Sequence, residues 1–284
     1  MGLLCPDCRR PLDESALTCP NGHRFHRQGG VLVLLDDDLA GRLAGFLEPF
    51  SRLRAAQGRR LTDPAAYPDL PFGPAAADNH EWRLRQHDLA VVTELLAGGS
   101  RQRILDVGAW NGWLSNRLAA QGHQVTAVDY FIDPYDGLGA RAFYDTSWRA
   151  IQMNLEDLEV LGQRFDMVIV NRCLQFFADP VAYAVQARAA VAPGGLLVLT
   201  GLAFLRDPSP RLAGLEALQD QLREHGLDFF KPLKGYLDFA DKTRLEAGGT
   251  SLRPYPGLWP ANLKSRLVAT APRYYYGLWR AGRG

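Results

Sequence analysis

The sequence predicts an α/β fold, in which a mostly parallel sheet is flanked by helices and preceded by a small cysteine-containing segment. Three observations support this prediction. From residue 80 onward, short apolar runs alternate with helix-like stretches, which is the pattern of strand–helix–strand units. One apolar run, residues 103–107, leads directly into a glycine turn. Three of the four cysteines lie within the first 19 residues.

Length and composition are those of one ordinary α/β domain with a smaller accessory module. The chain has 284 residues, 47% of them hydrophobic and 22% charged, with a formal net charge of +1. This charge balance gives no whole-protein attraction to nucleic acid or to an anionic membrane. There is no basic leader with an apolar core, and no run approaches about 18 consecutive apolar residues. We therefore expect a cytoplasmic protein with no membrane partner.

The N-terminal cysteines predict a zinc site. Cys5 and Cys8 are separated by two residues, and Cys19 and His23 by three. Zn²⁺ takes four tetrahedral nitrogen and sulfur ligands, and such turns place two ligands on each side of the metal. A full shell of four leaves no open position, so the metal is expected to be structural. Free thiols or a disulfide are the alternatives, and His26 competes as the fourth ligand.

Two segments precede the main domain, which is expected over residues 80–284. Residues 1–36 are predicted to form the zinc-binding unit, which ends in an apolar strand. Residues 37–79 are predicted to form a helical linker or lid. It begins with a helix over 39–57 that Pro49 bends, and it continues as a stretch rich in proline, alanine, glycine and aspartate.

The glycine turn is the centre of the predicted site. Residues 103–107 read as a buried strand that carries an acid, Asp106, just before the turn. Gly108 and Gly112 permit backbone torsions and close approaches that a Cβ would obstruct, at the N-terminus of the following helix. The sequence therefore predicts a nucleotide pocket at the end of a parallel strand. The Gly-x-Gly-x-x-Gly spacing of dinucleotide-binding proteins is absent.

The chain beyond the turn continues the alternation. Another helix is predicted before the strand of residues 103–107. It covers residues 80–97 and is closed by two glycines. Asp129 ends the second strand, 23 positions after Asp106, where an acid can accept hydrogen bonds from ribose hydroxyls. Further strands are predicted over 149–154, 164–171, 196–200, 251–255 and 266–270, and further helices over 180–191, 210–225 and 239–247. The last two of these seven strands can form an antiparallel edge.

These motifs, in this order, resemble class I S-adenosylmethionine (SAM) methyltransferases, which have a seven-stranded Rossmann-like sheet. The N-terminal segment resembles the zinc ribbon of bacterial ribosomal RNA guanine-N1 methyltransferases. It also resembles the small zinc-ribbon activator subunit of tRNA and protein methyltransferases. Both resemblances imply methyl transfer from SAM, with Zn²⁺ as a structural metal.

The resemblance implies a cofactor site made from the turn and the strand ends. Its residues would be Asp106, Gly108, Ala109, Gly112, Asp129, Tyr130, Asn154, Leu155 and Asn171, with Arg83 or Arg85 from the helix before the first strand. Two positions depart from the family pattern. Trp110 stands where a third glycine is usual, so its indole either points away from the cofactor or closes the turn to it. Asn154 replaces the usual acid at the adenine, although an amide oxygen can still accept a hydrogen bond.

Three functions stay open at this level: methylation of a small molecule, methylation of ribosomal or transfer RNA, and a non-catalytic binding or scaffolding role. No residue occupies a position that would identify a general base, and methyl transfer is largely a matter of positioning. RNA contact is suggested by a basic C-terminal segment with interleaved aromatic residues. Its members are Lys242, Arg244, Arg253, Lys264, Arg266, Arg273, Arg280 and Arg283, with Trp259, Tyr274, Tyr275, Tyr276 and Trp279.

Overall fold

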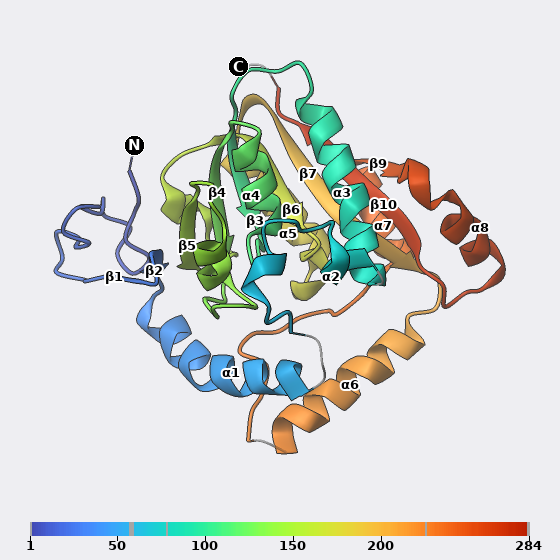
Figure 1. The fold of residues 1–284 in the computed structure, drawn as a ribbon, viewed down its shortest axis with the longest axis horizontal. Coiled ribbons are helices and arrows are strands. Elements are labelled where there is room, and N and C mark those ends of the chain that lie inside the picture. The colour runs from blue at the N-terminus through green and yellow to red at the C-terminus, as the bar shows by residue number, and fades with distance from the viewer. Residues whose placement is uncertain (1, 57–59, 78, 225, 283–284) are drawn as a thin grey trace.

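A ten-stranded sheet runs through the protein (Figure 1) in the computed structural model, which describes residues 2–56, 60–77, 79–224 and 226–282. The strand order is β1-β2-β5-β4-β3-β6-β7-β10-β9, and β8 pairs with β7 beside this path. The strands are β1 (His26–Gln28), β2 (Val31–Leu34), β3 (Arg103–Val107), β4 (Gln124–Asp129), β5 (Arg149–Met153), β6 (Phe165–Asn171), β7 (Val191–Leu205), β8 (Leu237–Asp238), β9 (Ser251–Pro254) and β10 (Arg273–Arg280).

The seven strands from β5 to β9 along this order form the predicted class I sheet. The strands β5, β4, β3, β6 and β7 are parallel neighbours, and β10 is antiparallel to both β7 and β9. The order reverses next to β3, where the chain crosses from β4 and β5 on one side to β6 and β7 on the other. A reversal of this kind opens a crevice at the carboxyl ends of the strands. The predicted α/β fold is confirmed.

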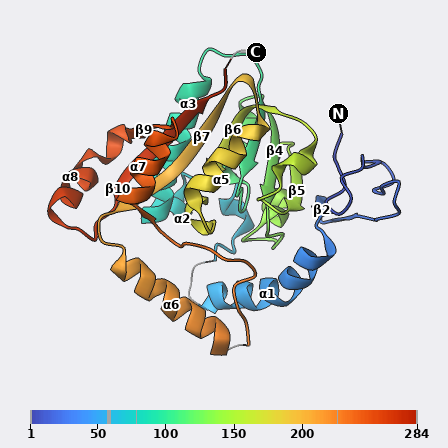
Figure 2. The same ribbon diagram turned by 180° about the vertical axis from the view of Figure 1, so that it is seen from behind.

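Helices cover both faces of the sheet (Figures 1 and 2) because the strand residues alternate between two apolar clusters. Ile104 packs with α3 and α4 on one face, whereas Leu105 packs with α5 and α7 on the other. The α-helices are α1 (Asp37–Ala56), α2 (Pro74–Ala77), α3 (His80–Leu96), α4 (Trp113–Ala120), α5 (Pro180–Ala187), α6 (Ser209–Glu224), α7 (Phe239–Ala247) and α8 (Trp259–Leu267). None of the described helices combines the length and apolar composition that crossing a bilayer requires.

The N-terminal segment extends the sheet of the main domain. Strand β2 is fully buried and lies parallel to β5, and β1 forms the outer edge beside it. Ahead of the strands, Leu3 is buried and the Leu4 N–H donates to the carbonyl of Val160 at 2.8 Å. The sheet therefore gains strands that the seven-strand prediction lacked, because the apolar run of residues 31–34 pairs across to β5.

The predicted strand over residues 266–270 is wrong. Helix α8 ends at Leu267, and the last strand along the chain lies later, at β10, between β7 and the edge strand β9. Leu267 is 87% exposed, so the apolar run that suggested a strand does not enter the core. The aromatic residues of β10 pack on the sheet instead, as Tyr275 does against Phe204 with ring centroids 5.9 Å apart.

Helices α1 and α6 cross the carboxyl-end edge of the sheet, at the bottom of Figure 1. Helix α1 is attached to the loop after β4, since Ser51 donates to Asp133 at 3.0 Å and Arg54 pairs with Asp136 at 2.9 Å. Although Pro49 lies inside it, α1 is one continuous helix. These contacts place α1 over the edge at which the predicted cofactor residues lie.

Candidate functional site

The glycine turn has the predicted left-handed backbone. The φ angle is +71° at Gly108 and +78° at Gly112. A Cβ at Gly108 would stand 2.5 Å from the sulfur of Cys173, and a Cβ at Gly112 would stand 2.4 Å from the ring of Trp148. Ala109 between them is fully buried. Protein neighbours therefore require both glycines, in addition to the backbone access that the sequence suggested.

Asp106 is a buried carboxylate with one free oxygen. Its side chain is 0% exposed, and its Oδ2 accepts a hydrogen bond from the Ser115 hydroxyl at 2.7 Å. Its Oδ1 has no hydrogen-bond partner among the described residues. Burial raises the pKa of Asp106 to about 7. A buried acceptor without a partner is costly, and a donor from a bound ligand would remove that cost.

Asp129 lies at the end of the neighbouring strand and holds the turn in place. Its Oδ2 accepts from the Trp110 N–H at 2.8 Å and its Oδ1 from the Phe131 N–H at 2.9 Å. Burial raises the pKa of Asp129 to about 6. A carboxylate offers about four lone-pair sites, so these two bonds leave capacity for ribose hydroxyls.

Trp110 adopts a left-handed conformation with a φ of +52° and directs its indole toward α3. The indole stacks on Trp82, with ring centroids 5.5 Å apart, and the Arg85 guanidinium lies over both rings at 5.0 and 5.1 Å. Burial lowers the pKa of Arg85 to about 10, and the nearby Arg172 adds to this effect. Of the two candidate arginines, Arg85 therefore reaches the turn, whereas Arg83 is exposed.

The part of the site predicted to bind adenine lies where the tips of neighbouring strands contact one another. The Tyr130 hydroxyl donates to Asn154 Oδ1 at 3.0 Å, and the Glu156 N–H donates to the same oxygen at 3.0 Å. This oxygen is thus already satisfied, so the side chain has its NH₂ group left to offer a ligand. The carbonyl of Leu155 accepts from the Tyr183 hydroxyl at 2.9 Å.

Residues from far along the sequence cover Tyr130. Phe230 meets its ring edge-on, with centroids 5.0 Å apart, and the Lys231 ammonium lies 5.4 Å from its centroid. Lys231 also pairs with Glu156 at 2.7 Å. The segment is held by α1, because Arg42 donates to the Phe230 carbonyl at 2.8 Å. This cover could not be predicted from the sequence, since an aromatic–basic pair after a helix carries no motif.

A buried polar network supports the end of β6. Asn171 is buried and its Oδ1 accepts from the Thr200 hydroxyl at 3.4 Å. Next to it, Arg172 pairs with the fully buried Asp88 of α3 at 3.0 Å. The Tyr255 hydroxyl donates to Asp88 and accepts from the Gly201 N–H at 2.8 Å. Asp88 and Tyr255 were not predicted, and their sequence separation explains why.

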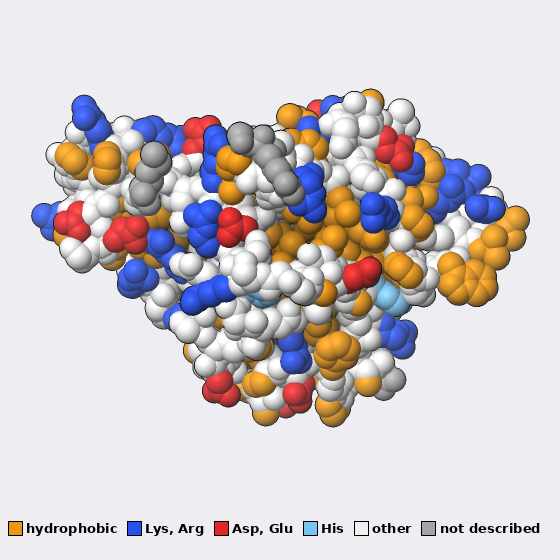
Figure 3. Space-filling model, turned by 90° about the horizontal axis from the view of Figure 1, so that it is seen from above, with side chains coloured by type: hydrophobic (Ala, Val, Ile, Leu, Met, Phe, Trp, Pro, Cys, Tyr) orange, Lys and Arg blue, Asp and Glu red, His pale blue; other side chains and the backbone are white. Residues whose placement is uncertain are grey.

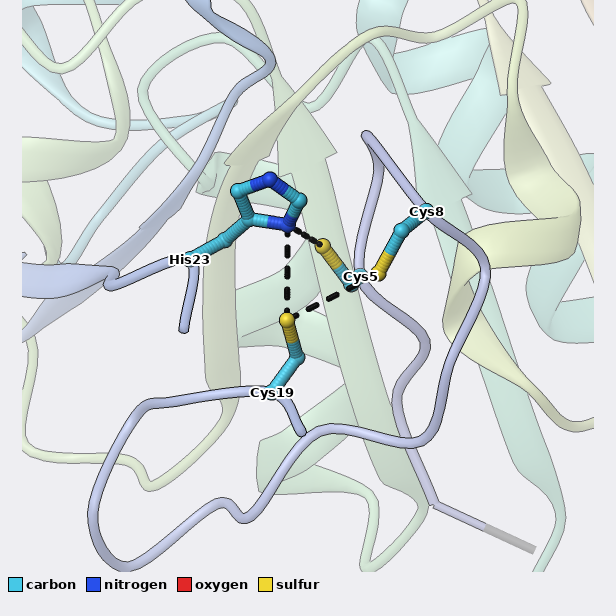
Figure 4. Close-up of side chains that lie close together, drawn as sticks. All are labelled: Cys5, Cys8, Cys19 and His23. Atoms are coloured by element: carbon cyan, nitrogen blue, oxygen red, sulfur yellow. Dashed lines mark hydrogen bonds between the residues drawn. The ribbon is translucent and has the colours of Figure 1, made fainter. Parts of the chain in front are cut away.

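The four predicted zinc ligands come together at the N-terminus (Figure 4). The ligand atoms of Cys5, Cys8, Cys19 and His23 all lie within 4.8 Å of one another. Nδ1 of His23 lies 3.3 Å from the Cys5 sulfur and 3.4 Å from the Cys19 sulfur, and the sulfurs of Cys8 and Cys19 are 3.6 Å apart. His26 is exposed in β1 and stands outside this group. Bonds of about 2.3 Å to a central metal give tetrahedral edges of roughly 3.8 Å, which is close to these separations.

The aromatic residues of the C-terminal segment are mostly used in packing, whereas its basic residues Arg253, Lys264, Arg266 and Arg280 are exposed. Tyr276 packs against Tyr255, with centroids 5.3 Å apart, and Arg188 lies over Trp279 at 4.9 Å. Stacking on RNA bases needs freely presented rings, and Trp259, at 67% exposed, is the ring of this segment that meets the condition among the described residues.

Comparison with known proteins connects this geometry to a family. Residues 81–233, more than half of the chain, match the family described as "Methyltransferase domain". A ubiquinone biosynthesis O-methyltransferase from Cereibacter sphaeroides is 35% identical over 103 residues, which cover 35% of this chain and 41% of that protein. A malonyl-[acyl-carrier protein] O-methyltransferase from Hahella chejuensis is 32% identical over 114 residues, which cover 39% of this chain and 40% of that protein. The match thus spans about two fifths of the length of these relatives.

Among solved structures, the plantazolicin methyltransferase BpumL is similar in fold. It aligns with a TM-score of 0.50 at 14% identity, over 87% of this chain and 95% of that one. At this identity the likeness concerns the arrangement of helices and strands alone. Together with the strand order, the glycine turn and the matched residues 81–233, it shows that the chain belongs to the methyltransferase domain family with the class I fold.

Proposed function

We propose that the protein transfers a methyl group from SAM to an oxygen atom of a small-molecule acceptor. The observation that carries this proposal is the unpaired oxygen of Asp106, which is buried at the end of β3 beside the glycine turn. No cation of the described residues reaches this carboxylate, so it suits the ammonium group of an amino-acid ligand.

The residues at the strand ends support a role for this chain at each part of the cofactor. Asp106 and the turn from Gly108 to Gly112 would hold the methionine portion, Asp129 would accept from the ribose hydroxyls, and the Asn154–Leu155 corner would contact the adenine. When bound, SAM supplies an electrophilic methyl group on a sulfonium. The chain's part is then to hold the acceptor in line with it and to exclude water. Trp110 is compatible with this arrangement because its indole packs on Trp82.

The acceptor would lie between the ends of β6 and β7 and the helices α1 and α6. An oxygen acceptor is supported by the names of the two relatives, both of which are O-methyltransferases. The segment after β6 lacks the Asn/Asp-Pro-Pro-Tyr/Phe sequence of enzymes that methylate amino groups of adenine or glutamine. On this basis residues 80–284 form the catalytic domain, and residues 37–79 help to close it.

We also propose that residues 1–36 form a ribbon that binds one structural Zn²⁺ through Cys5, Cys8, Cys19 and His23. Four protein ligands would complete the shell, so the metal would not take part in the methyl transfer. A cluster of free thiols suits a reducing compartment such as the cytoplasm.

Two measurements test the proposal in order. Isothermal titration of the purified protein with S-adenosylhomocysteine should show binding, and absence of binding would leave only the fold. Incubation of fractionated cell extract with methyl-labelled SAM should then place label in the small-molecule fraction. An Asp129→Ala variant serves as the control without cofactor binding. Label that enters RNA or protein instead would contradict the proposed acceptor class.

A further inference from the structure

Helix α8 is amphipathic with its apolar side facing outward. Trp259, Leu263 and Leu267 lie four residues apart and are 67%, 50% and 87% exposed. At 3.6 residues per turn, this spacing places them in one stripe along the helix. Val268, just after the helix, is also 40% exposed. Isolated exposed apolar residues are common, but a continuous stripe marks an interaction surface.

Polar groups attach the opposite side of α8 to the protein. Asn262 donates to the Tyr274 carbonyl at 3.1 Å and accepts from the Tyr274 N–H at 2.7 Å. Ser265 is buried, and its hydroxyl accepts from Arg273 at 2.9 Å. Since α8 is held by these hydrogen bonds, its apolar residues are not required for docking onto β10.

Basic side chains lie on both sides of the stripe. At about 100° per residue, Lys264 and Arg266 flank the row of Trp259, Leu263 and Leu267, and both are exposed. Arg253 of the adjacent β9 is exposed as well. Residues 248–284 contain six basic residues and no acid. Figure 3 shows hydrophobic side chains next to Lys and Arg at the end of the molecule that carries α8.

We propose that α8 and its basic border form a docking surface for an anionic membrane. A helix with Trp and Leu on one side and Lys and Arg beside them lies in the interface of a bilayer, with its apolar side among the acyl chains and its cations at the phosphates. The positive border favours a negatively charged surface over a neutral one. This surface does not depend on methyl transfer, so it stands independently of the proposed function.

The whole-chain properties that suggested no membrane partner do not bear on such a surface. A net charge of +1 describes the sum over the chain, whereas the attraction here acts within a Debye length of about 8–10 Å. The absence of a spanning helix among the described residues concerns insertion across the bilayer. A helix that lies on the membrane surface requires neither a high net charge of the whole chain nor a membrane-spanning segment.

Sedimentation with lipid vesicles tests the proposal on the full-length protein. Vesicles of phosphatidylcholine alone are compared with vesicles that also contain phosphatidylglycerol. The wild type should bind the second kind, and less so as salt rises. The Leu263→Glu/Leu267→Glu variant should lose binding. The Lys264→Gln/Arg266→Gln variant should bind roughly thirtyfold more weakly, since each basic residue near an anionic surface contributes about 1 kcal/mol.

Matched variants on other exposed surfaces provide the controls. Val185→Glu replaces an exposed apolar residue of α5 (48% exposed), and Arg27→Gln/Arg101→Gln removes two exposed basic residues elsewhere. Both should bind vesicles like the wild type, and thermal unfolding should confirm that every variant folds. Equal binding to both kinds of vesicle, or none, would overturn the proposal. If the protein does not bind vesicles, either of two results would assign α8 to another partner: a dimer that the Leu263→Glu/Leu267→Glu variant dissociates, or retention of RNA.

Discussion

Two buried carboxylates lie at the ends of adjacent parallel strands, and their requirements differ. Asp129 accepts hydrogen bonds from two backbone N–H groups, whereas Asp106 accepts one from the Ser115 hydroxyl through Oδ2 and its buried Oδ1 has no partner among the described residues. Burial without a cation raises the pKa of both. A bound ligand would therefore satisfy an unmet hydrogen bond at Asp106 rather than at Asp129. The feature that suits Asp106 to the cofactor, a buried oxygen without a partner, is also one that lowers the folding stability of the cofactor-free protein.

The variant Asp106→Asn should weaken binding of S-adenosylhomocysteine by roughly ten- to hundredfold, because a hydrogen bond to a charged group contributes about 1.5–3 kcal/mol. Calorimetric titration measures this change. Glu216→Gln, which neutralises an exposed acid on α6, is the control and should bind like the wild type. Unchanged affinity in Asp106→Asn would show that the cofactor's ammonium lies elsewhere.

The same carboxylates should make the cofactor-free protein less stable as pH rises. Their folded pKa values, about 7 and about 6, lie above the ordinary value of 3.8, so the folded state binds more protons than the unfolded state between these limits. The stability they contribute is fully present below about pH 4 and is lost as pH rises through their folded pKa values.

Urea unfolding measures this effect at about pH 5 and about pH 8. Other groups titrate too, so the informative quantity is the difference between the wild type and Asp106→Asn/Asp129→Asn. The double variant should lose less stability on going to the higher pH, by an amount on the order of a few kcal/mol. A parallel pH dependence in both proteins would mean that the carboxylates are solvated.

At the scale of elements, the contact between the glycine turn and α3 depends on Trp110. A non-glycine residue in the left-handed region costs about 1–2 kcal/mol, and this cost is offset by the stack with Trp82 (about 0.5–1.5 kcal/mol) and the Arg85 contact (about 0.5–1 kcal/mol). The Trp110→Gly variant removes both the cost of the left-handed backbone and the stabilising contacts of the indole. Its free energy of unfolding should stay within about 1 kcal/mol of the wild type, as measured by urea unfolding.

The affinity of Trp110→Gly for S-adenosylhomocysteine reports where the indole lies. Because the ring packs on α3, we expect the affinity to stay within roughly threefold of the wild type, a change of well under 1.4 kcal/mol. If the indole filled the cofactor's volume, the glycine variant would bind many times more tightly. That result would contradict the arrangement proposed for the turn.

The elements that could be predicted from the sequence are those whose signals are local. The strand of residues 103–107, its glycine turn and the acid at the end of the next strand follow from patterns within about thirty residues. The cover of Tyr130 by Phe230 and the pairing of Asp88 with Tyr255 could not be predicted, because these contacts join residues 100 and 167 positions apart. The pairing of β2 with β5 could not be predicted for the same reason, because a run of apolar residues does not indicate which strand it pairs with.

At the scale of the whole molecule, the N-terminal segment and the main domain share one sheet. Strand β2 covers the edge of β5, and the Leu4 N–H donates to the Val160 carbonyl beyond it. Arg9 and Glu14 of the same segment pair with Asp157 and Arg149 of the main domain. Loss of structure in the N-terminal segment should therefore destabilise the main domain, since an uncovered strand edge exposes unpaired backbone groups.

Metal removal should test this coupling. If Zn²⁺ holds the cluster together, a chelator should lower the unfolding temperature of the whole chain in a single transition, by on the order of 10 °C for a loss of several kcal/mol. Differential scanning calorimetry, with zinc quantified by elemental analysis, measures both quantities. Cys8→Ser should reproduce the effect of the chelator. Cys173→Ala should retain the metal, because that cysteine is buried beside Gly108 and away from the cluster. Two separate transitions would mean that the segment unfolds on its own despite the shared sheet, and metal-free wild type with an unchanged unfolding temperature would exclude a structural role for zinc.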